Sequence, residues 1–356
     1  MAKEIASSRK RLQKRVSDSP KAEDVAREAG VSTATVSRYL ANQSSVSEKR
    51  GALIQKAIEA LGYIPHGAAQ ALASQRTKTI GVIVPTLDNA IFAEGIQAFQ
   101  RRLQEKGFTL FIASSDYSLD EELAQAERLV TRGVEGLMLV GSEHHPQLFD
   151  ILEKKQIPYL YTWSYKPELG HPCIGFNNHQ ASARLTQYLL DLGHKDFAVV
   201  SGILHFNDRT KDRLEGCLDT LEKAGISIPK ESIMECRYDL SESRQMMKKL
   251  LAREPKPSVV VCGNDVIAMG VLLEAQHQGI KIPEEISVVG FDDLALSSHF
   301  QPALTTMHVP SKEMGQRAAD YLLARLEDEH ASEHQELEAK LVVRETTTKP
   351  NKKAPA

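Results

Sequence analysis

From residue 79 onward, short apolar runs rich in β-branched residues alternate with amphipathic segments of helical length. The first series begins at TIGVIV, and after Phe176 the alternation starts again. Strands separated by helices of this length predict parallel sheets joined by right-handed crossovers. Two such series in tandem predict two lobes, each a doubly wound α/β sheet.

The segments LTTMHV, 311–328 and KLVVRE follow the second series, and we expect them to pass back between the lobes. The expected strands are TIGVIV, FTLFIA, GLMLV, IPYLYT, DFAVVS, a short strand near 232, SVVVC and ISVVG. The expected helices cover 90–106, 119–132, 146–154, 178–192, 210–224, 241–253 and 264–278. We expect an N-lobe of about 79–176 and 308–338, a C-lobe of about 177–307 and 339–348, and a tail of 349–356.

The segment 21–65 has the pattern of three short helices. In AEDVAREAG the apolar residues recur at the spacing of one helix face, and Gly30 stands where a helix can end in a left-handed residue. Ser32 can cap a second helix, TATVSRYL, and Ser47 a third that reaches Leu61. The third helix is expected to close the core with Leu53, Ile54, Ala57, Ile58 and Leu61. A helix, a glycine turn and a helix predict a helix-turn-helix.

Charge is unevenly distributed between the two parts. Residues 1–78 hold 14 Lys and Arg against 7 Asp and Glu, whereas residues 79–356 hold 30 against 40. A basic part beside an acidic part suggests that the first part binds a polyanion. Residues 1–20 form a basic arm, expected to be disordered, with Arg9, Lys10, Arg11, Lys14 and Arg15.

A helix-turn-helix exposes the start of its second helix to the major groove of DNA. The residues predicted to face the groove are Thr33, Ala34, Thr35, Ser37 and Arg38. Arg38 can pair with a guanine edge, which would specify sequence, or with a phosphate, which would only position the protein. A plain three-helix surface module is the alternative to DNA binding.

Several phrases of the sequence resemble the lactose-repressor (LacI/GalR) family of bacterial transcriptional regulators. The matching phrases, from residue 21 to about 348, are DVAREAGVSTATVSRYLANQSSVSEKR, GYIPHGAAQALA, GVIVP, NDVIAMG, ISVVGFDD and LTT. The resemblance implies an all-α helix-turn-helix head and a two-lobed sensor similar to periplasmic binding proteins. It also implies a repressor that binds a pseudo-palindromic operator as a homodimer and responds to a small effector, a sugar or sugar acid.

The resemblance gives a role to 66–78 as a hinge helix and linker. In that family a leucine of this segment wedges between base pairs in the minor groove, and Leu72 stands at the matching position, with small Ala69 nearby. Gly67 is an unfavourable residue for a hinge helix, because glycine disfavours a helix by about 1 kcal/mol relative to alanine.

Ligands of doubly wound sheets bind at the carboxyl ends of the strands. In the first lobe the candidates that follow expected strands are 85–92, which includes Phe92, then Asp116 with Tyr117, and Trp163. In the second lobe they are 207–213, 264–265 and 292–293. The resemblance points to three polar contacts from the second lobe, Arg213, Asn264 and Asp292. Trp163 could form an aromatic wall with Tyr161 and Phe92, or it could be core packing.

The sequence argues against catalysis and against cofactors. It has no GxGxxG after the first strand and no GxxxxGK[ST], GxSxG or HExxH motif, and the neighbouring Asp292 and Asp293 would point in different directions. Its four cysteines lack CxxC spacing, which disfavours disulfides and metal sites. Without an apolar run of about 20 residues or a signal peptide, we expect a cytoplasmic, nucleoid-associated protein without membrane contact.

Two further expectations concern assembly and the alternative function. The tail lacks a leucine heptad, which disfavours a tetramer held by a terminal coiled coil. A free-standing small-molecule-binding protein without a DNA role is the alternative function, because the sensor alone would fit it.

Overall fold

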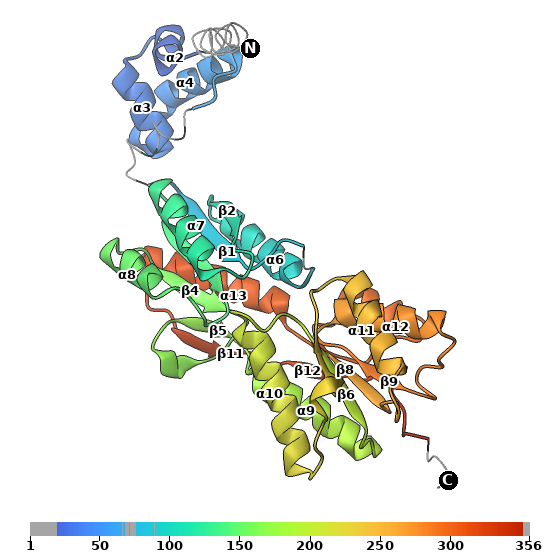
Figure 1. The fold of residues 1–356 in the computed structure, drawn as a ribbon. Coiled ribbons are helices and arrows are strands. Elements are labelled where there is room, and N and C mark those ends of the chain that lie inside the picture. Colours follow the sequence, from blue (N-terminus) through green and yellow to red (C-terminus); the bar gives the residue numbers. More distant parts are fainter. Residues whose placement is uncertain (1–19, 66, 68–70, 72–75, 89, 352–356) are drawn as a thin grey trace, which may run out of the picture. The chain divides into compact units, whose positions relative to one another are not determined.

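The computed structural model describes residues 20–65, 67, 71, 76–88 and 90–351 (Figure 1). The chain divides into two compact units, Met1–Lys78 and Thr79–Ala356. The expected positions Ala69 and Leu72, and residues 1–19 of the basic arm, lie outside the described residues.

The described part of the first unit is a small three-helix core. Its elements are α2 (Ala22–Ala29), α3 (Thr33–Ala41), the short 3₁₀ helix η1 (Gln43–Ser45) and α4 (Glu48–Leu61). Gly30 ends α2 with a φ of 66°, and the Ser32 hydroxyl accepts a hydrogen bond from the Thr35 amide at 3.2 Å, which caps α3. Val25, Val36 and Ile54 are fully buried between the helices. Leu53, expected in this core, is instead 46% exposed.

The N-lobe of the second unit is a parallel sheet of six strands in the order β11-β5-β4-β3-β1-β2. Its strands are β1 (Thr79–Val84), β2 (Thr109–Ser114), β3 (Gly136–Val140), β4 (Tyr159–Thr162), β5 (Cys173–Gly175) and β11 (His334–Glu336). Its helices are α6 (Ile91–Glu105), α7 (Leu119–Thr131), α8 (Pro146–Lys154) and α13 (Ser311–Leu326), with a 3₁₀ turn η2 (Pro167–Leu169).

Side-chain alternation in β1 explains why both faces of this sheet are covered. Ile80, Val82 and Val84 face the core that contains α6 and α13, whereas Ile83 joins the core beneath α7 and α8. A parallel strand buried on both faces has no polar side to alternate with. The apolar run TIGVIV is therefore a central strand.

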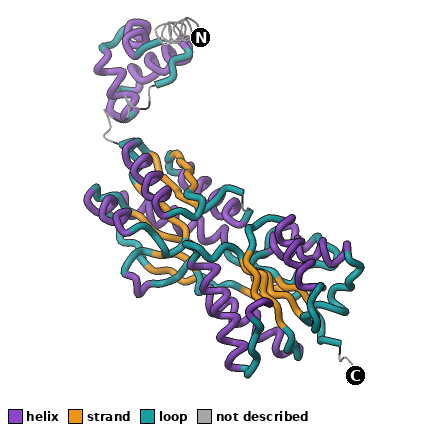
Figure 2. The backbone as a smooth tube through the Cα atoms, viewed as in Figure 1, coloured by secondary structure: helices purple, strands orange, loops and turns teal. Residues whose placement is uncertain are grey.

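The C-lobe is a second parallel sheet, of four strands in the order β7-β6-β8-β9. Its strands are β6 (Phe197–Ser201), β7 (Ile233–Glu235), β8 (Val259–Cys262) and β9 (Ser287–Val289). Its helices are α9 (Asn178–Leu192), α10 (Asp208–Lys223), α11 (Leu240–Leu251) and α12 (Asp265–His277), with 3₁₀ turns η3 (Lys230–Ser232) and η4 (Ala295–Ser298). Helices α9 and α10 pack together on one face and α11 and α12 on the other (Figure 2).

The chain passes between the lobes again near its end. Strand β10 (Thr306–His308) pairs antiparallel with β12 (Lys340–Val342), and between them α13 and β11 return to the N-lobe. The two-lobed α/β fold with a helix-turn-helix head is thus confirmed. Strands β5 and β11, of three residues each, were not expected from the sequence.

Helices α6 and α13 pack unusually closely on the N-lobe sheet. A Cβ atom at Gly315 would lie 2.1 Å from the Gly95 carbonyl oxygen, so only glycine fits there. A Cβ atom at Gly95 would also lie 2.7 Å from the ring of Trp163. This crossing therefore holds the start of α6 and Trp163 in place beside the cleft.

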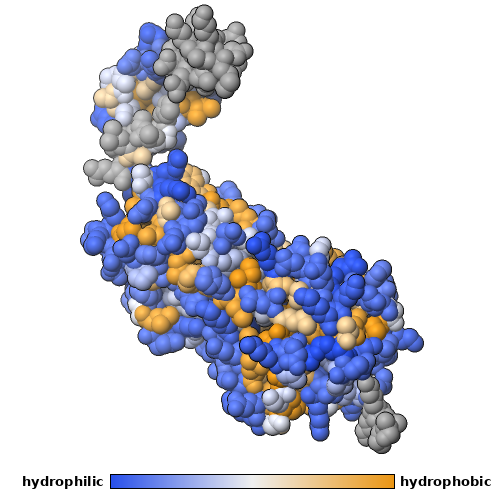
Figure 3. Space-filling model, viewed as in Figure 1, coloured by the Kyte–Doolittle hydropathy of each residue, from blue (hydrophilic) through white to orange (hydrophobic). Residues whose placement is uncertain are grey.

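The surface of the second unit is mostly hydrophilic on the face seen in Figure 3, with separate hydrophobic patches. Over the described ranges, no helix is both long and apolar enough to cross a bilayer.

Candidate functional site

A small cavity lies between the two lobes, at the carboxyl ends of the strands. The N-lobe contributes residues that follow β1 and β2, and the C-lobe contributes residues that follow β6, β7, β8 and β9. The lining residues are Ile91, Phe92, Tyr117, Asn207, Arg209, Thr210, Arg213, Tyr238, Asn264 and Asp292. Four predicted residues, Phe92, Arg213, Asn264 and Asp292, are therefore brought together.

Arg213 is a buried cation of this cavity with several fixed contacts. It lies on α10, is 8% exposed, and donates to Asn178 Oδ1 at 2.8 Å and to the Gly263 carbonyl at 3.1 Å. Its guanidinium lies 3.8 Å from the centre of the Phe291 ring and 3.5 Å from Asp292 Oδ1. Burial raises the pKa of Asp292, and the nearby Arg213 charge opposes that rise. The fork of Arg213 is thus fixed in direction before any ligand binds.

Asn264 and Asp292 of the C-lobe each have one side-chain atom bonded within the protein and a second polar atom left for the cavity. Asn264 caps α12 through its Oδ1, which accepts from the Ile267 amide at 2.9 Å. Its Nδ2 is buried and has no hydrogen-bond partner within the protein, and neither has Asp292 Oδ2. Asp292 has a φ of 116°, a strained conformation that turns its carboxylate toward Arg213.

Trp163 and Asp116, two of the candidates, do not line the cavity. Trp163 is fully buried and its ring meets Phe92 edge-on, with the ring centres 5.3 Å apart. It supports Phe92 from behind, and Tyr161 is likewise buried in the core. Asp116 is exposed, and its neighbour Tyr117 enters the cavity instead.

A polar network on the C-lobe side joins residues of the candidate segment 207–213 to Tyr238, which the sequence analysis did not propose. Asn207 Nδ2 donates to the Ile203 carbonyl, to Thr210 Oγ1 and to the hydroxyl of Tyr238 at 2.8–2.9 Å. Tyr238 follows the short strand β7, and the strand-end rule applied there would have found it. Arg209, one helical turn before Arg213, also lines the cavity.

Asp208 joins the two lobes at the first turn of α10. Its Oδ2 accepts from the Ser142 amide at 3.0 Å, the Ser142 hydroxyl at 2.7 Å and the Ser164 hydroxyl at 2.5 Å, all from the N-lobe. Its Oδ1 accepts from Arg209 at 2.8 Å. Burial alone would raise its pKa, but the Arg209 charge and the two serine hydroxyls lower the pKa of Asp208 to about 2.

Two ion pairs flank Asp208 and also join the lobes. Lys166 contacts Asp212 at 3.0 Å, and Lys211 contacts Glu143 at 2.6 Å. These contacts and those of Asp208 hold the cleft closed around the cavity.

Two other acidic residues near the cleft are structural. Asp265 accepts from the Ser297 and Thr306 hydroxyls and from the Leu294 amide, and burial raises its pKa to about 6. Asp293 pairs with Arg344 and His308. Neither lines the cavity.

In the first unit, α3 presents a polar outer face. Thr33, Ala34, Ser37 and Arg38 are exposed, as expected for a helix that contacts DNA. Thr35 was expected to face the groove but is only 7% exposed, and its hydroxyl lies 2.8 Å from that of Ser32. Thr35 therefore belongs to the capping turn of α3, and we remove it from the predicted groove-facing set.

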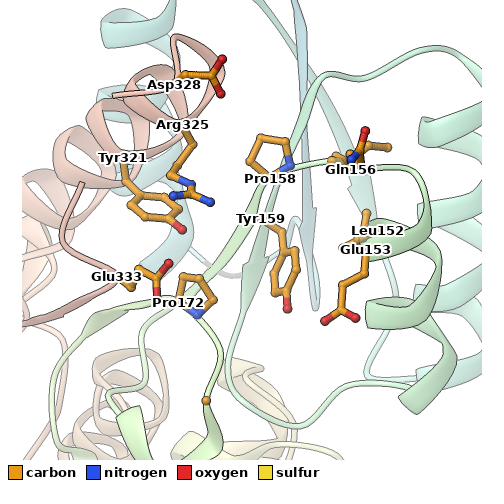
Figure 4. A pocket seen from close by; sticks show the side chains of 12 residues that line it. Leu152, Glu153, Gln156, Pro158, Tyr159, Pro172, Tyr321, Arg325, Asp328 and Glu333 are labelled. Atoms are coloured by element: carbon orange, nitrogen blue, oxygen red, sulfur yellow. The ribbon is translucent and has the colours of Figure 1, made fainter. Parts of the chain in front are cut away.

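A wide open pocket lies at the amino-terminal end of the N-lobe strands, opposite the cavity between the lobes (Figure 4). Tyr321, Arg325 and Glu333 stand on one side of it and Tyr159 and Glu153 on the other. It adjoins the amino-terminal start of β4, away from the carboxyl ends where such sheets bind ligands. In the described part of the chain, no three His, Cys, Asp or Glu side chains are grouped so as to hold a metal ion.

Two family descriptions match this sequence. Residues 22–66 match the bacterial regulatory proteins of the lacI family, and residues 186–347 match the periplasmic binding protein-like domain. The HTH-type transcriptional repressor PurR of Proteus mirabilis is 33% identical over 305 residues, covering 85% of this chain and 89% of its own. PurR of Vibrio parahaemolyticus is 31% identical over 332 residues, covering 92% and 98%.

Solved structures of similar proteins share the whole architecture. A LacI family transcriptional regulator from Silicibacter pomeroyi superposes with a TM-score of 0.84 at 28% identity, over 92% of this chain and 99% of that one. The lac repressor dimer bound to operator and the anti-inducer ONPF superposes with a TM-score of 0.81 at 26% identity, over the same shares.

Proposed function

The chain belongs to the lacI family of bacterial regulatory proteins and is a DNA-binding transcriptional repressor, and from this premise we propose that it binds a pseudo-palindromic operator as a homodimer under the control of a small effector. The observation that carries the effector part is the closed cleft between the lobes, where Arg213, Asn264 and Asp292 converge. An exposed reading helix, α3, supports the operator part.

Strand β2 supports dimerisation through the N-lobe. It is an edge strand of the six-stranded sheet, and Phe111 and Ile112 on it are 38% and 45% exposed. Exposed apolar side chains on an edge strand favour pairing with a second copy. A similar protein, the lac repressor, has been solved as a dimer on its operator. Two copies would present two α3 helices to two half-sites.

The effector acts by coupling cleft closure to DNA binding. The ligand contacts both lobes and so changes the stability of the closed arrangement that Asp208 holds. Lobe closure in turn alters the dimer and with it the spacing of the hinge segments, for which the Leu72 wedge stays a prediction. Linkage requires that an effector that lowers DNA affinity also binds more weakly to the DNA-bound dimer.

We propose no catalytic activity, because the relatives of this chain are transcriptional regulators. We place the protein in the cytoplasm, on the nucleoid, because the operator is there. A free-standing binding protein is disfavoured by the match of residues 22–66 to a DNA-binding family.

Replacement of Arg38 by alanine tests the DNA-reading part of this proposal. A bidentate contact to a guanine edge contributes about 1–3 kcal/mol of discrimination, so the ratio of operator to random-duplex affinity should fall about 5- to 150-fold. Fluorescence anisotropy with both duplexes at one salt concentration measures this ratio. Arg27→Ala, which removes an exposed arginine of α2, is the matched control. An unchanged ratio with uniformly weaker binding would assign Arg38 to a phosphate.

A further inference from the structure

The open pocket at the amino-terminal end of the N-lobe strands has a volume of about 630 Å³, within the range of about 300–1,000 Å³ that small-molecule sites occupy. It is built from the end of α8, the start of β4, the loop before β5, the end of α13 and the segment before β11. Glu153 and Tyr159 stand on one side of it, and Tyr321, Arg325 and Glu333 on the other (Figure 4). In the described chain it shares no lining residue with the cavity between the lobes.

Tyr321 is a buried polar residue on the wall of this pocket. It is only 3% exposed, and its hydroxyl forms no hydrogen bond with any described residue. Burial raises the pKa of Tyr321 to about 12, so the hydroxyl keeps its proton at neutral pH. Tyr159 on the facing wall does have a partner, because its hydroxyl lies 2.8 Å from His171 Nδ1. The hydroxyl of Tyr321 is thus a free hydrogen-bonding group that the fold holds in one place for a bound molecule.

Four charged side chains of the pocket are also free. The carboxylates of Glu153, Asp328 and Glu333 and the guanidinium of Arg325 form no hydrogen bond or ion pair within the part of the chain that the structure describes. Three carboxylates stand against one guanidinium, so negative charge is in excess. These charges are therefore available to a ligand.

Two helices end at this pocket, one on each side. Helix α8 ends at Lys154 and α13 at Leu326, and the chain then turns through Gln156 and Asp328, which both have a φ of 54° and line the pocket. The carboxyl end of a helix carries about half a negative charge, which favours cations beside it. The helix ends and the carboxylates together make both walls attractive to cationic groups.

The guanidinium of Arg325 defines the rest of the ligand. It stands on the same wall as Glu333, and Glu153 stands on the opposite wall (Figure 4). A free guanidinium binds a carboxylate through two parallel hydrogen bonds. The matching molecule carries a carboxylate with one cationic group beside it and a second cationic group farther away. A basic α-amino acid has this arrangement, and its methylene chain can pack on the rings of Tyr159 and Tyr321.

We propose that this pocket is a second ligand site, which binds a free basic amino acid of the lysine type. The carboxylate of the ligand pairs with Arg325, its α-ammonium with Glu333 and its side-chain ammonium with Glu153. The site goes beyond the proposed function, because it lies outside the cavity between the lobes. It is also separate from the proposed dimer edge, since β3 and β1 lie between β4 and β2 in the sheet.

Calorimetry on the full chain with L-lysine, cadaverine and L-norleucine tests this site. Cadaverine is lysine without its carboxylate, and norleucine is lysine without its side-chain ammonium. We expect lysine to bind about 10-fold or more tightly than either, because each relative lacks one hydrogen-bonded contact to a charged group. Equal binding of cadaverine or norleucine, or the absence of saturable lysine binding, would overturn the inference.

Three variants assign the contacts. Arg325→Gln should remove the preference for lysine over cadaverine, and Glu153→Gln the preference for lysine over norleucine. Tyr321→Phe should weaken lysine binding about 3-fold or more, the effect of one neutral hydrogen bond. Lys312→Gln on α13 and Asp150→Asn on α8 remove exposed charges outside the pocket and should preserve both preferences.

Arg325 and Glu153 are exposed and without ion-pair partners among the described residues, so their replacement spares the fold. Neither lines the cavity between the lobes, and loss of its preference in each variant therefore places lysine in the open pocket. A preference that survives its own variant contradicts the proposed contacts. The measurements contain no duplex DNA, so their failure is distinct from failure of operator binding.

Discussion

Arg213→Ala is expected to abolish the effect of the effector on operator binding, with about a 10- to 150-fold loss of effector affinity. The guanidinium is buried, fixed by Asn178 and Gly263, and faces the carboxylate of Asp292 in the cavity. Removing it deletes a directed, charged hydrogen-bond donor, and a hydrogen bond to such a group contributes about 1.5–3 kcal/mol. The probe is the strongest binder in a thermal-shift screen of sugars, sugar acids and purines. Its titration into the operator complex, followed by anisotropy, measures the response.

Two controls distinguish a binding role from loss of the fold. Lys223→Ala removes an exposed cation from the end of the same helix and should leave the response intact. Arg213→Lys keeps a positive charge near Asp292 but loses the planar fork, so its effector affinity should lie between that of the original chain and that of Arg213→Ala. A full response in Arg213→Ala would exclude Arg213 from the site.

Asp208→Ala is expected to lower the free energy of unfolding of the two-lobed unit by about 3–5 kcal/mol, because it leaves Arg209 buried without its ion-pair partner. The substitution also removes the acceptor that binds Ser142 and Ser164 across the cleft. Urea unfolding at neutral pH measures the change. Asp219→Ala, an exposed carboxylate on the same helix, should cost less than about 1 kcal/mol.

The carboxylate of Asp208 also makes the free energy of unfolding depend on pH, with a known sign. Because its pKa is lowered to about 2 from an ordinary 3.8, the stabilising contribution of Asp208 is present above about pH 4 and is lost as the pH falls through about 2. The shift corresponds to about 2 kcal/mol. Unfolding of Asp208→Ala should therefore depend less on pH in this window than that of the original chain. Equal pH dependence would contradict the role of Asp208.

The arrangement of strands and helices was predictable because buried parallel strands and amphipathic helices leave distinct patterns. The strand-end rule found Phe92 and the segments that contain Arg213, Asn264 and Asp292, and the family resemblance selected those three residues, which the structure brings together with Phe92. Strands β5 and β11 escaped prediction. Strand β7 was expected, but Tyr238, which follows it, was not proposed as a site residue.

Side-chain direction after a strand could not be read from the sequence. Trp163 has a φ of 62°, which turns the ring into the core behind Phe92. Asp116 and Tyr117 both have positive φ, so nothing in their order shows which one enters the cleft. The inter-lobe contacts of Asp208 depend on the distant Ser142 and Ser164, which no local pattern connects.

The most direct measurement is sedimentation of the full chain with a duplex selected from a random library, before and after addition of the best-binding probe. We predict two chains per duplex, bending of that duplex, and a change in affinity on addition of the probe. One chain per duplex at saturation, or an affinity indifferent to every probe that binds the cleft, would contradict the coupling of paired reading helices to lobe closure.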